Sequence, residues 1–231
     1  MEESSDDLAV GIAAAVRAVA PDGVSVGARC ITPDDERMLR GHEHTAVRSV
    51  LAGRRSEFAT GRVLLRQVIG RDVAIPVGSD RRPQLPPGVV ASLAHDDRVA
   101  VAAATAVTTA AALGIDIEPM SALTPAELAI VRRPDDSDVE PIAVFVAKEA
   151  AYKAWSSLGG GLIDHHALRL RADGDHFVVD VVDDEGFSLP GRFARGHGRW
   201  IALVVVTDPK LTIAHRTRPR RLGPAMPPDR R

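Results

Sequence analysis

The feature that most constrains this chain is a predicted helix with charged residues on one side. Residues 145–155 read FVAKEAAYKAW, an alanine-rich and otherwise apolar segment. In a helix, Glu149 and Lys153 lie four residues apart and point to the same side. Lys148 adjoins Glu149 at about 100° around the helix axis. An acid and an amine fixed together on such a segment are unusual, and they indicate either a site or a buried ion pair.

A short acidic strand is predicted before this helix. Residues 114–118 read GIDIE, and a strand here places Asp116 and Glu118 on one face. Together with Glu149 they would supply three carboxylates, which suit Mg²⁺ bound through carboxylate oxygens, water and a substrate phosphate. Lys153 could then neutralise charge on a phosphate that is transferred or leaves. From spacing alone, a buried charge network that only locks the strand to the helix is an equal alternative.

Basic residues accompany two further predicted elements. Ser56 is a candidate N-cap of a helix that carries Arg62, with Arg54 and Arg55 in the loop before it. A helix N-terminus beside two arginines suits an anion, although a solvated basic cap is the simpler interpretation. His95, at the end of a predicted strand, is open to the same two interpretations, a phosphate contact or a surface histidine.

The remaining sequence alternates between helix and strand patterns. Further helices are predicted at 8–20 and from Thr32, Ser121 and Pro141, and strands at 24–31, 89–95, 98–109, 167–171, 177–182, 191–195 and 200–206. The strands at 89–95 and 98–109 form a predicted hairpin, and the last four form a predicted antiparallel sheet. The tail 216–231, with six arginines and four prolines, cannot bury a core and is predicted to be disordered.

Composition argues against several classes of protein. A net charge of −2 provides no basic field for nucleic acid. The single cysteine, Cys30, excludes an internal disulfide and a cysteine-based zinc site. The acidic N-terminus is unlike a signal peptide and no apolar run is long enough to span a bilayer, so a cytoplasmic protein without membrane partners is expected. His42, His44, His165 and His166 lack a zinc pattern and are interpreted as surface residues.

The motifs follow an order that resembles one known family, the Sfp-type 4'-phosphopantetheinyl transferases. Residues 114–118, followed by FxxKEAxxK at 145–153, look like the signature of that family. RRSEFxxGR at 54–62, RPxxPxG at 82–88 and SLAH at 92–95 resemble its enterobactin-synthetase-component-D-like branch. The resemblance extends from about residue 36 to residue 206. No GxxxxGK[ST] loop, GxGxxG turn or GxSxG elbow points elsewhere.

The resemblance implies a fold and a reaction. The implied fold is α+β, a pseudo-two-fold pair of similar α/β subdomains at 1–113 and 114–215 in one monomer, with coenzyme A in the cleft between them. Coenzyme A would donate its 4'-phosphopantetheine arm to a serine of an apo acyl, peptidyl or aryl carrier protein, and 3',5'-ADP would leave. The family needs Mg²⁺. A homologue that binds coenzyme A or a carrier protein without catalysis is the alternative.

The resemblance also implies roles for single residues. Asp116, Glu118 and Glu149 would hold the metal, and Glu149 would also act, directly or through water, as the base that deprotonates the carrier serine. Lys153 would bind the α-phosphate side and stabilise the leaving group. The residues that match contacts to coenzyme A are Arg54, Arg62, Arg81 or Arg82, Ser92, His95, Lys148 and Lys153.

The sequence departs from the family at the predicted coenzyme A end. Ala94 stands where Ser or Thr usually precedes the histidine, and Asp96 stands where the branch often has Cys. The first change removes a hydroxyl expected on the 3'-phosphate and the second adds negative charge, so activity is expected with weaker affinity for coenzyme A or with less dependence on its 3'-phosphate. The carrier is expected to be a small acidic helical domain that docks on apolar and basic surface near the cleft, including residues 119–141.

Overall fold

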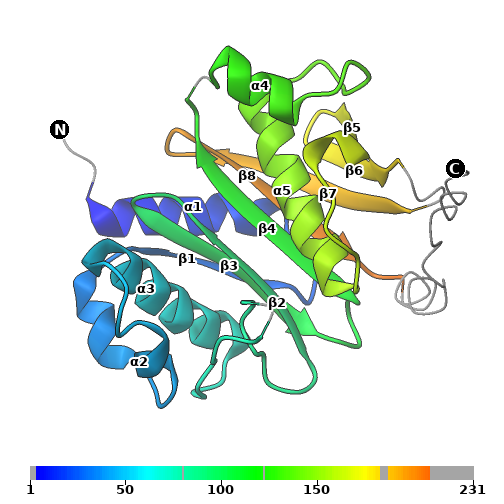
Figure 1. Cartoon of the computed structure of the whole chain (residues 1–231). Coiled ribbons are helices and arrows are strands. Elements are labelled where there is room, and N and C mark those ends of the chain that lie inside the picture. Colours follow the sequence, from blue (N-terminus) through cyan, green and yellow to red (C-terminus); the bar gives the residue numbers. More distant parts are fainter. Residues whose placement is uncertain (1–3, 80, 122, 183–186, 209–231) are drawn as a thin grey trace, which may run out of the picture.

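Two antiparallel sheets and the helices packed on them make up the protein (Figure 1). A computed structural model describes residues 4–79, 81–121, 123–182 and 187–208. The helices are α1 (Ser5–Val19), η1 (Pro33–Met38), α2 (Glu43–Ala46), α3 (Ala52–Ile69), α4 (Pro125–Val131), α5 (Pro141–Ser157) and η2 (His165–Ala167). The strands are β1 (Ser25–Cys30), β2 (Val89–His95), β3 (Val99–Ala106), β4 (Ala112–Pro119), β5 (Leu168–Asp173), β6 (His176–Val181), β7 (Ser188–Gly196) and β8 (Arg199–Val206). The α+β class is as predicted, and the predicted disordered tail lies outside the described residues.

The first sheet has three strands in the order β1-β3-β2, and α3 packs on it. The predicted β2–β3 hairpin is confirmed, and every residue of the alanine-rich central strand from Val99 to Thr105 is buried. Small side chains let α3 approach the sheet closely. A Cβ added to Gly61 would lie 2.7 Å from Leu93 Cδ2, so a larger residue would require this leucine side chain to move. The close approach sets the position of the neighbouring Arg62 relative to β2.

The second sheet has five strands in the order β4-β8-β7-β6-β5, and the predicted antiparallel pairing of its last four strands is confirmed. Alternate residues of β8 face its two covering helices. Trp200, Ala202 and Val204 pack with α5, whereas Ile201 and Leu203 pack with α1. Of the helices that the structure describes, neither these two nor any other is long and apolar enough to cross a membrane.

The contact between β4 and α5 positions the predicted acidic group. Gly114 lies under α5, where an added Cβ would be 1.8 Å from the carbonyl oxygen of Ala150, so only glycine fits. The strand pleat places Asp116 and Glu118 on the same side as Gly114, whereas the intervening isoleucines are buried with α1. The predicted two-residue alternation therefore directs both carboxylates toward α5.

Besides apolar packing, two polar side-chain contacts among the described residues join the sheets where β2 lies beside β4. Ser92 Oγ on β2 accepts a hydrogen bond from the backbone N–H of Ile115 at 3.0 Å. Asp96, in the turn after β2, forms a buried ion pair with Arg199 of β8, with 2.6 Å between Oδ2 and Nε. Because of these contacts, the end of β2 that carries His95 is fixed to the second sheet.

The prediction that Ser56 caps a helix is wrong. Helix α3 begins four residues earlier, at Ala52, so Arg54 and Arg55 lie in its first turn rather than in a preceding loop. The hydroxyl of Ser56 instead contacts Glu36 Oε1 at 3.1 Å and the carbonyl oxygen of Ala52 at 3.3 Å. A serine inside a helix often bonds back to the preceding turn in this way, and the sequence pattern does not separate the two positions.

Candidate functional site

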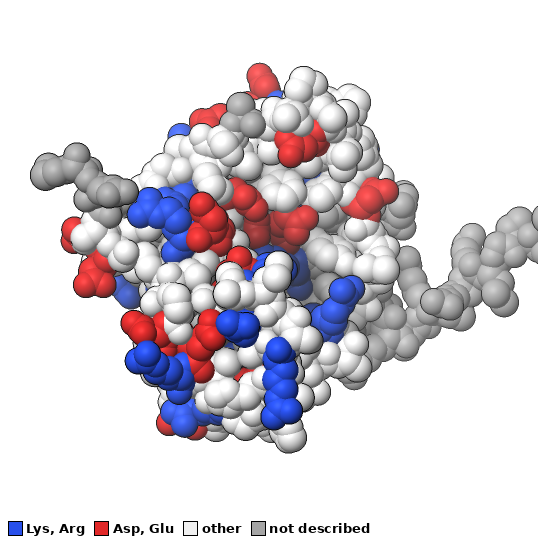
Figure 2. All heavy atoms as spheres, turned by 60° about the vertical axis from the view of Figure 1, so that its left-hand side comes forward, with Lys and Arg blue, Asp and Glu red and all other residues white. Residues whose placement is uncertain are grey.

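A cleft of about 1240 Å³ opens between α3 and α5. Its walls come from α3, the loop at 77–85, β2 and the C-terminal half of α5. Its volume exceeds the roughly 300–1,000 Å³ that is typical of sites for drug-sized ligands. The predicted site residues that line it are Arg54, Arg62, Arg81, Arg82, Ser92, His95 and Lys153. Figure 2 shows a face of the molecule on which acidic side chains gather in a hollow, with lysine and arginine side chains below it.

Lys153 and Asp116 meet at the α5 side of the cleft. Lys153 Nζ donates to Asp116 Oδ1 at 2.6 Å and to the carbonyl oxygen of Ile115 at 3.0 Å. Burial raises the pKa of Asp116, and the charge of Lys153 opposes that shift. The second oxygen of Asp116, Oδ2, is buried and has no hydrogen-bond partner among the described residues. This oxygen is therefore available to a cation.

Glu118 and Glu149 complete the predicted acidic group. Burial raises the pKa of Glu118 to about 7, and the negative charge of Asp116 adds to the shift. Glu149 is shifted in the opposite direction, because a hydrogen bond from His165 lowers its pKa despite partial burial. The charge of Glu149 in turn raises the pKa of both other acids. The three carboxylates are thus close enough to repel one another.

These carboxylates do not form a complete set of metal ligands as they stand. Within the described ranges, no group of three His, Cys, Asp or Glu side chains is positioned to hold an ion. One oxygen of Asp116 is bonded to Lys153, and one oxygen of Glu149 is bonded to His165. A hard divalent cation would use the unpartnered Asp116 Oδ2 and relieve the repulsion among the acids. Because Mg²⁺ is usually bound by one or two carboxylates plus water and phosphate, the residues fit Mg²⁺ that arrives with a phosphate ligand.

Arg62 is a buried cation on the α3 side of the cleft. Its side chain is 4% exposed, and its guanidinium carbon lies 4.2 Å from the ring centre of Phe58. Its Nε has no hydrogen-bond partner in the part of the chain that the structure describes. Burial lowers its pKa to about 10, so the group stays charged at neutral pH. Since an unpaired buried charge is costly, an arginine of this kind beside a cleft indicates an anionic ligand.

Glu57 lies between two of the predicted phosphate contacts. Its Oε2 accepts a hydrogen bond from Arg54 Nη1 at 2.7 Å and lies 3.7 Å from His95 Nε2. The carboxylate therefore occupies a place where an anion could bridge the arginine and the histidine. Glu57 is part of the RRSEF motif, but nothing in the sequence indicated this contact.

The loop arginines and Ser92 also line the cleft, each with a contact of its own. Arg82 Nη1 donates to the carbonyl oxygen of Ser156 at 2.7 Å, which ties the loop to the end of α5. Arg81 is exposed and has a left-handed backbone, with φ of 65°. Either arginine can supply the predicted basic contact. Ser92 accepts from the backbone of β4, which leaves its hydroxyl proton for a ligand.

Lys148 does not line the cleft. Its side chain is 0% exposed, and its Nζ donates to Asp136 Oδ2 at 2.7 Å and to the carbonyl oxygens of Val131 at 2.8 Å and His165 at 3.1 Å. An ammonium group has three protons, so protein acceptors satisfy all of them. The geometry favours a structural role for Lys148, joining α5 to α4 and η2, instead of the predicted phosphate contact.

Asp96 adds no free negative charge to the cleft. Its carboxylate pairs with Arg199, and its Oδ1 accepts hydrogen bonds from the backbone N–H groups of Arg98 and Val99 at 2.7 Å each. The predicted weakening of coenzyme A affinity therefore loses one of its two reasons. Ala94, the other reason, is buried with 6% exposure.

Two residues belong to the site although the sequence reasoning placed neither there. His165 Nε2 lies 2.9 Å from Glu149 Oε1, which corrects its interpretation as a simple surface histidine. Tyr152, the single tyrosine, lines the cleft. Asp164, which caps η2 with its side chain, was the available signal for a tight turn. Nothing in the sequence directs the ring of the next residue toward α5.

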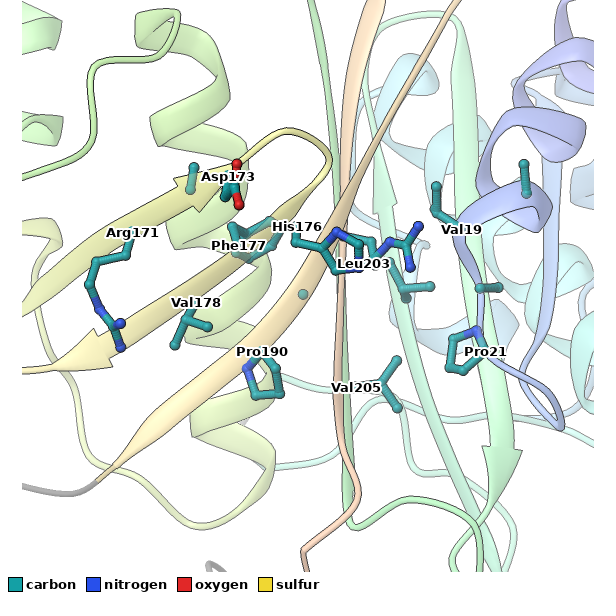
Figure 3. A pocket seen from close by; sticks show the side chains of 15 residues that line it. Val19, Pro21, Arg171, Asp173, His176, Phe177, Val178, Pro190, Leu203 and Val205 are labelled. Atoms are coloured by element: carbon teal, nitrogen blue, oxygen red, sulfur yellow. The ribbon is translucent and has the colours of Figure 1, made fainter.

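A second cavity, of about 550 Å³, lies on the α1 side of the five-stranded sheet (Figure 3). Val19 and Pro21 at the end of α1 form one wall, and Val178, Pro190 and Val205 of the sheet lie opposite. The walls are mainly apolar, and no predicted site residue lines them. The cleft between α3 and α5 is therefore the better candidate site.

Comparisons with known proteins agree with the motifs. Residues 42–105 match the 4'-phosphopantetheinyl transferase N-terminal domain, and residues 112–197 match the 4'-phosphopantetheinyl transferase superfamily. The chain is 33% identical over 206 residues to 4'-phosphopantetheinyl transferase Svp of Streptomyces mobaraensis, and 30% identical over 190 residues to 4'-phosphopantetheinyl transferase Npt of Nocardia iowensis. Each comparison covers 77% of this chain and 82% of the relative. The matches do not distinguish the branch that the motifs suggested. They show that the chain belongs to the 4'-phosphopantetheinyl transferase superfamily and is a transferase.

Proposed function

We propose that this transferase moves the 4'-phosphopantetheine arm of coenzyme A onto a serine of a small apo carrier protein, with Mg²⁺ as cofactor and 3',5'-ADP as the second product. One observation carries the proposal: the cleft has a buried, unpaired arginine on one side and, on the other, a lysine that is bonded to the carboxylate of Asp116. Coenzyme A has matching charges, with a 3'-phosphate on its nucleotide and a pyrophosphate before the pantetheine arm.

The α3 side of the cleft suits the phosphates of the nucleotide. Arg62 is the best-supported contact, because its guanidinium is buried and lacks a carboxylate partner within the described residues. Arg54 and His95 would join it once a phosphate displaces the carboxylate of Glu57 that lies between them. The hydroxyl of Ser92 and one loop arginine would complete the contacts.

The α5 side suits the reacting pyrophosphate. The carrier serine forms a bond from Oγ to the phosphorus next to the pantetheine arm, the bond from that phosphorus to the bridging oxygen breaks, and 3',5'-ADP leaves with the electron pair. Glu149, kept ionised by His165, accepts the serine proton directly or through water. Lys153, held beside Asp116, stabilises the charge that develops on the leaving phosphate. Asp116, Glu118 and Glu149 would hold Mg²⁺, which would neutralise charge on the pyrophosphate.

Exposed apolar side chains suit the carrier, which we take to be a small acidic helical domain. In the segment 119–141, Met120 is 45% exposed and Ile130 is 63% exposed. Leu162, which lines the cleft, is 93% exposed. Leu162 and the cleft arginines would receive an amphipathic helix with an acidic face, and the segment 119–141 would extend this surface.

Mass spectrometry of apo carrier proteins tests the proposal. Acyl, peptidyl and aryl carriers are incubated with the enzyme, coenzyme A and Mg²⁺, and we expect one phosphopantetheine group on one serine of at least one carrier. Glu149→Gln should lower turnover by about 10²-fold or more, since it removes the proton acceptor. Asp22→Asn makes the same carboxylate-to-amide change at an exposed position outside the cleft and outside the segment 119–141, and should retain activity. Binding of coenzyme A without modification of any carrier would instead identify a non-catalytic homologue.

A further inference from the structure

The imidazole of His165 lies against the proposed catalytic base. Its Nε2 is 2.9 Å from Glu149 Oε1, and the two side chains are only 22% and 29% exposed. They come from different elements, η2 and α5, which the fold brings together. Within the described ranges, Oε2 of Glu149 makes no hydrogen bond. One carboxylate oxygen is therefore held by the protein and the other is open.

Three contacts hold this histidine in place. Lys148 Nζ donates to the carbonyl oxygen of His165 at 3.1 Å. The ring of Phe145 lies 5.6 Å from the imidazole, centre to centre, at 31° between the planes. Asp164 caps η2, with its Oδ1 accepting from a backbone N–H of that turn at 2.9 Å. The adjacent residues Lys148 and Glu149 therefore both bind His165, one at its backbone and the other at its ring.

An oriented carboxylate is a better base and a better ligand than a rotating one. Without the imidazole, Glu149 could turn either oxygen toward a serine hydroxyl or a cation. When His165 Nε2 is hydrogen-bonded to Oε1, only Oε2 of Glu149 is left for these partners. Groups that orient a ligating or catalytic side chain in this way typically contribute about 10–100-fold to metal affinity or activity.

We propose that His165 is a positioning residue for Glu149: it holds Oε1, so that Oε2 is left to accept the serine proton and to bind the metal. The inference rests on the proposed function, in which Glu149 serves as base and metal ligand. His165 itself contacts neither substrate nor metal in this account. His165 acts only by its hydrogen bond to Glu149. The buried Lys148, which is paired with Asp136, holds the backbone of His165 in place.

Three variants separate this role from simple packing. His165→Leu keeps an apolar side chain of moderate size beside Phe145 but removes the donor. His165→Gln keeps an N–H that can reach Glu149. His166→Leu is the matched control, because His166 adjoins the site and bonds to the carbonyl oxygen of Ala129 of α4 instead, at 2.9 Å. Thermal unfolding of each variant shows that it is folded.

Two quantities are then measured on the whole protein. The first is kcat and KM for coenzyme A on a carrier that the wild type modifies. The second is the affinity for Mn²⁺ alone, read by electron paramagnetic resonance. We expect His165→Leu to lower kcat by about 10–100-fold with little change in KM, and to weaken Mn²⁺ binding by about tenfold or more. His165→Gln should recover most of both quantities, and His166→Leu should match the wild type.

Equal kcat and equal Mn²⁺ affinity in wild type and His165→Leu would overturn the inference. Equal losses in His165→Gln and His165→Leu would overturn it too, because the claim concerns a hydrogen bond and not the ring. Failure of the proposed function looks different, since the wild type itself would then modify no carrier. In that case the Mn²⁺ affinities of wild type and variants decide about His165, and no wild-type binding of Mn²⁺ would overturn the inference as well.

Discussion

Two sides of helix α5 use the same kind of ion pair for different purposes. Lys153 faces the cleft, is 29% exposed, and bonds to Asp116 and to a β4 carbonyl oxygen. Lys148 faces α4 and η2, is 0% exposed, and bonds to Asp136 and to two carbonyl oxygens. The two lysines lie about 140° apart around the helix axis, so they cannot serve one ligand. The side with partial exposure is suited to chemistry, and the sealed side to holding the fold.

The carboxylate partners differ in the same way. Asp136 has further donors, the backbone N–H groups of Arg133 and Leu170, each at 2.7 Å. Asp116 has a buried oxygen with no partner among the described residues. A saturated carboxylate indicates a structural tie, whereas an unsaturated one beside a cleft indicates a place for a ligand.

The largest effect that distinguishes the two lysines is expected in Lys148→Met. Removing one partner of a fully buried pair typically costs about 3–5 kcal/mol of folding free energy, since Asp136 would keep an uncompensated charge. We expect a loss of this size in urea unfolding. Turnover of the folded fraction should fall less than in the matched variant Lys153→Met. Wild-type stability together with lost turnover would instead support the predicted phosphate contact.

Lys153→Met should show the opposite balance. The loss of a positive charge at the leaving phosphate is expected to lower turnover by about 10²–10³-fold. Stability should change less than in Lys148→Met, because Lys153 is partly solvated and Asp116 can take up a proton. Steady-state kinetics and urea unfolding of the same preparation measure both effects. A large loss of stability with normal turnover would show that both lysines are structural.

Arg62 and Arg66 extend the comparison to α3. Arg66 is buried and paired with Glu43 at 2.8 Å, whereas Arg62 has no carboxylate partner within the described residues. Arg62→Met should leave stability unchanged or raised and weaken coenzyme A binding by about 10–100-fold, the size of a charge-assisted hydrogen bond. Arg66→Met should destabilise the fold. Calorimetric titration with coenzyme A and thermal unfolding check both, and unchanged affinity in Arg62→Met would remove Arg62 from the site.

The smallest expected effect is a pH dependence that Glu118 gives to the metal-free protein. Burial and the charge of Asp116 raise its pKa from the ordinary 4.5 to about 7. Between these values the folded state holds a proton that the unfolded state has released, so stability falls as pH rises toward 7. Unfolding in a chelating buffer at several pH values measures this slope. Glu118→Gln should flatten it, and an identical slope in both proteins would contradict the shift.

Many helices and strands, and the faces on which their charged residues lie, could be predicted from the sequence because they depend on local patterns. The alternation around Asp116 and Glu118 is a property of any strand, and Gly114 is explained by the close approach of α5. The helix predicted from Ser121 is observed from Pro125, where Thr124 forms a capping box, and the helix predicted from Pro141 starts at that residue. The spacing of Glu149 and Lys153 on α5 likewise follows from helix geometry.

The remaining features depend on contacts between distant parts of the chain. The sequence shows two lysines on one helix, but only the packing of α4 and η2 seals Lys148 away from solvent. Asp96 was expected to add charge near the phosphate site, and Arg199, 103 residues away, pairs with it instead. The bond from His165 to Glu149 depends on the turn at η2, whose direction no short-range pattern specifies.

The transfer from coenzyme A to a carrier is tested most directly when both products are quantified in one reaction. Enzyme, coenzyme A, Mg²⁺ and an apo carrier are mixed, and modified carrier and free 3',5'-ADP are measured over time. We expect equal amounts of the two products, formed only with Mg²⁺ and sharply reduced by Glu149→Gln. Tight binding of coenzyme A to the cleft with neither product formed, on any carrier, would contradict it.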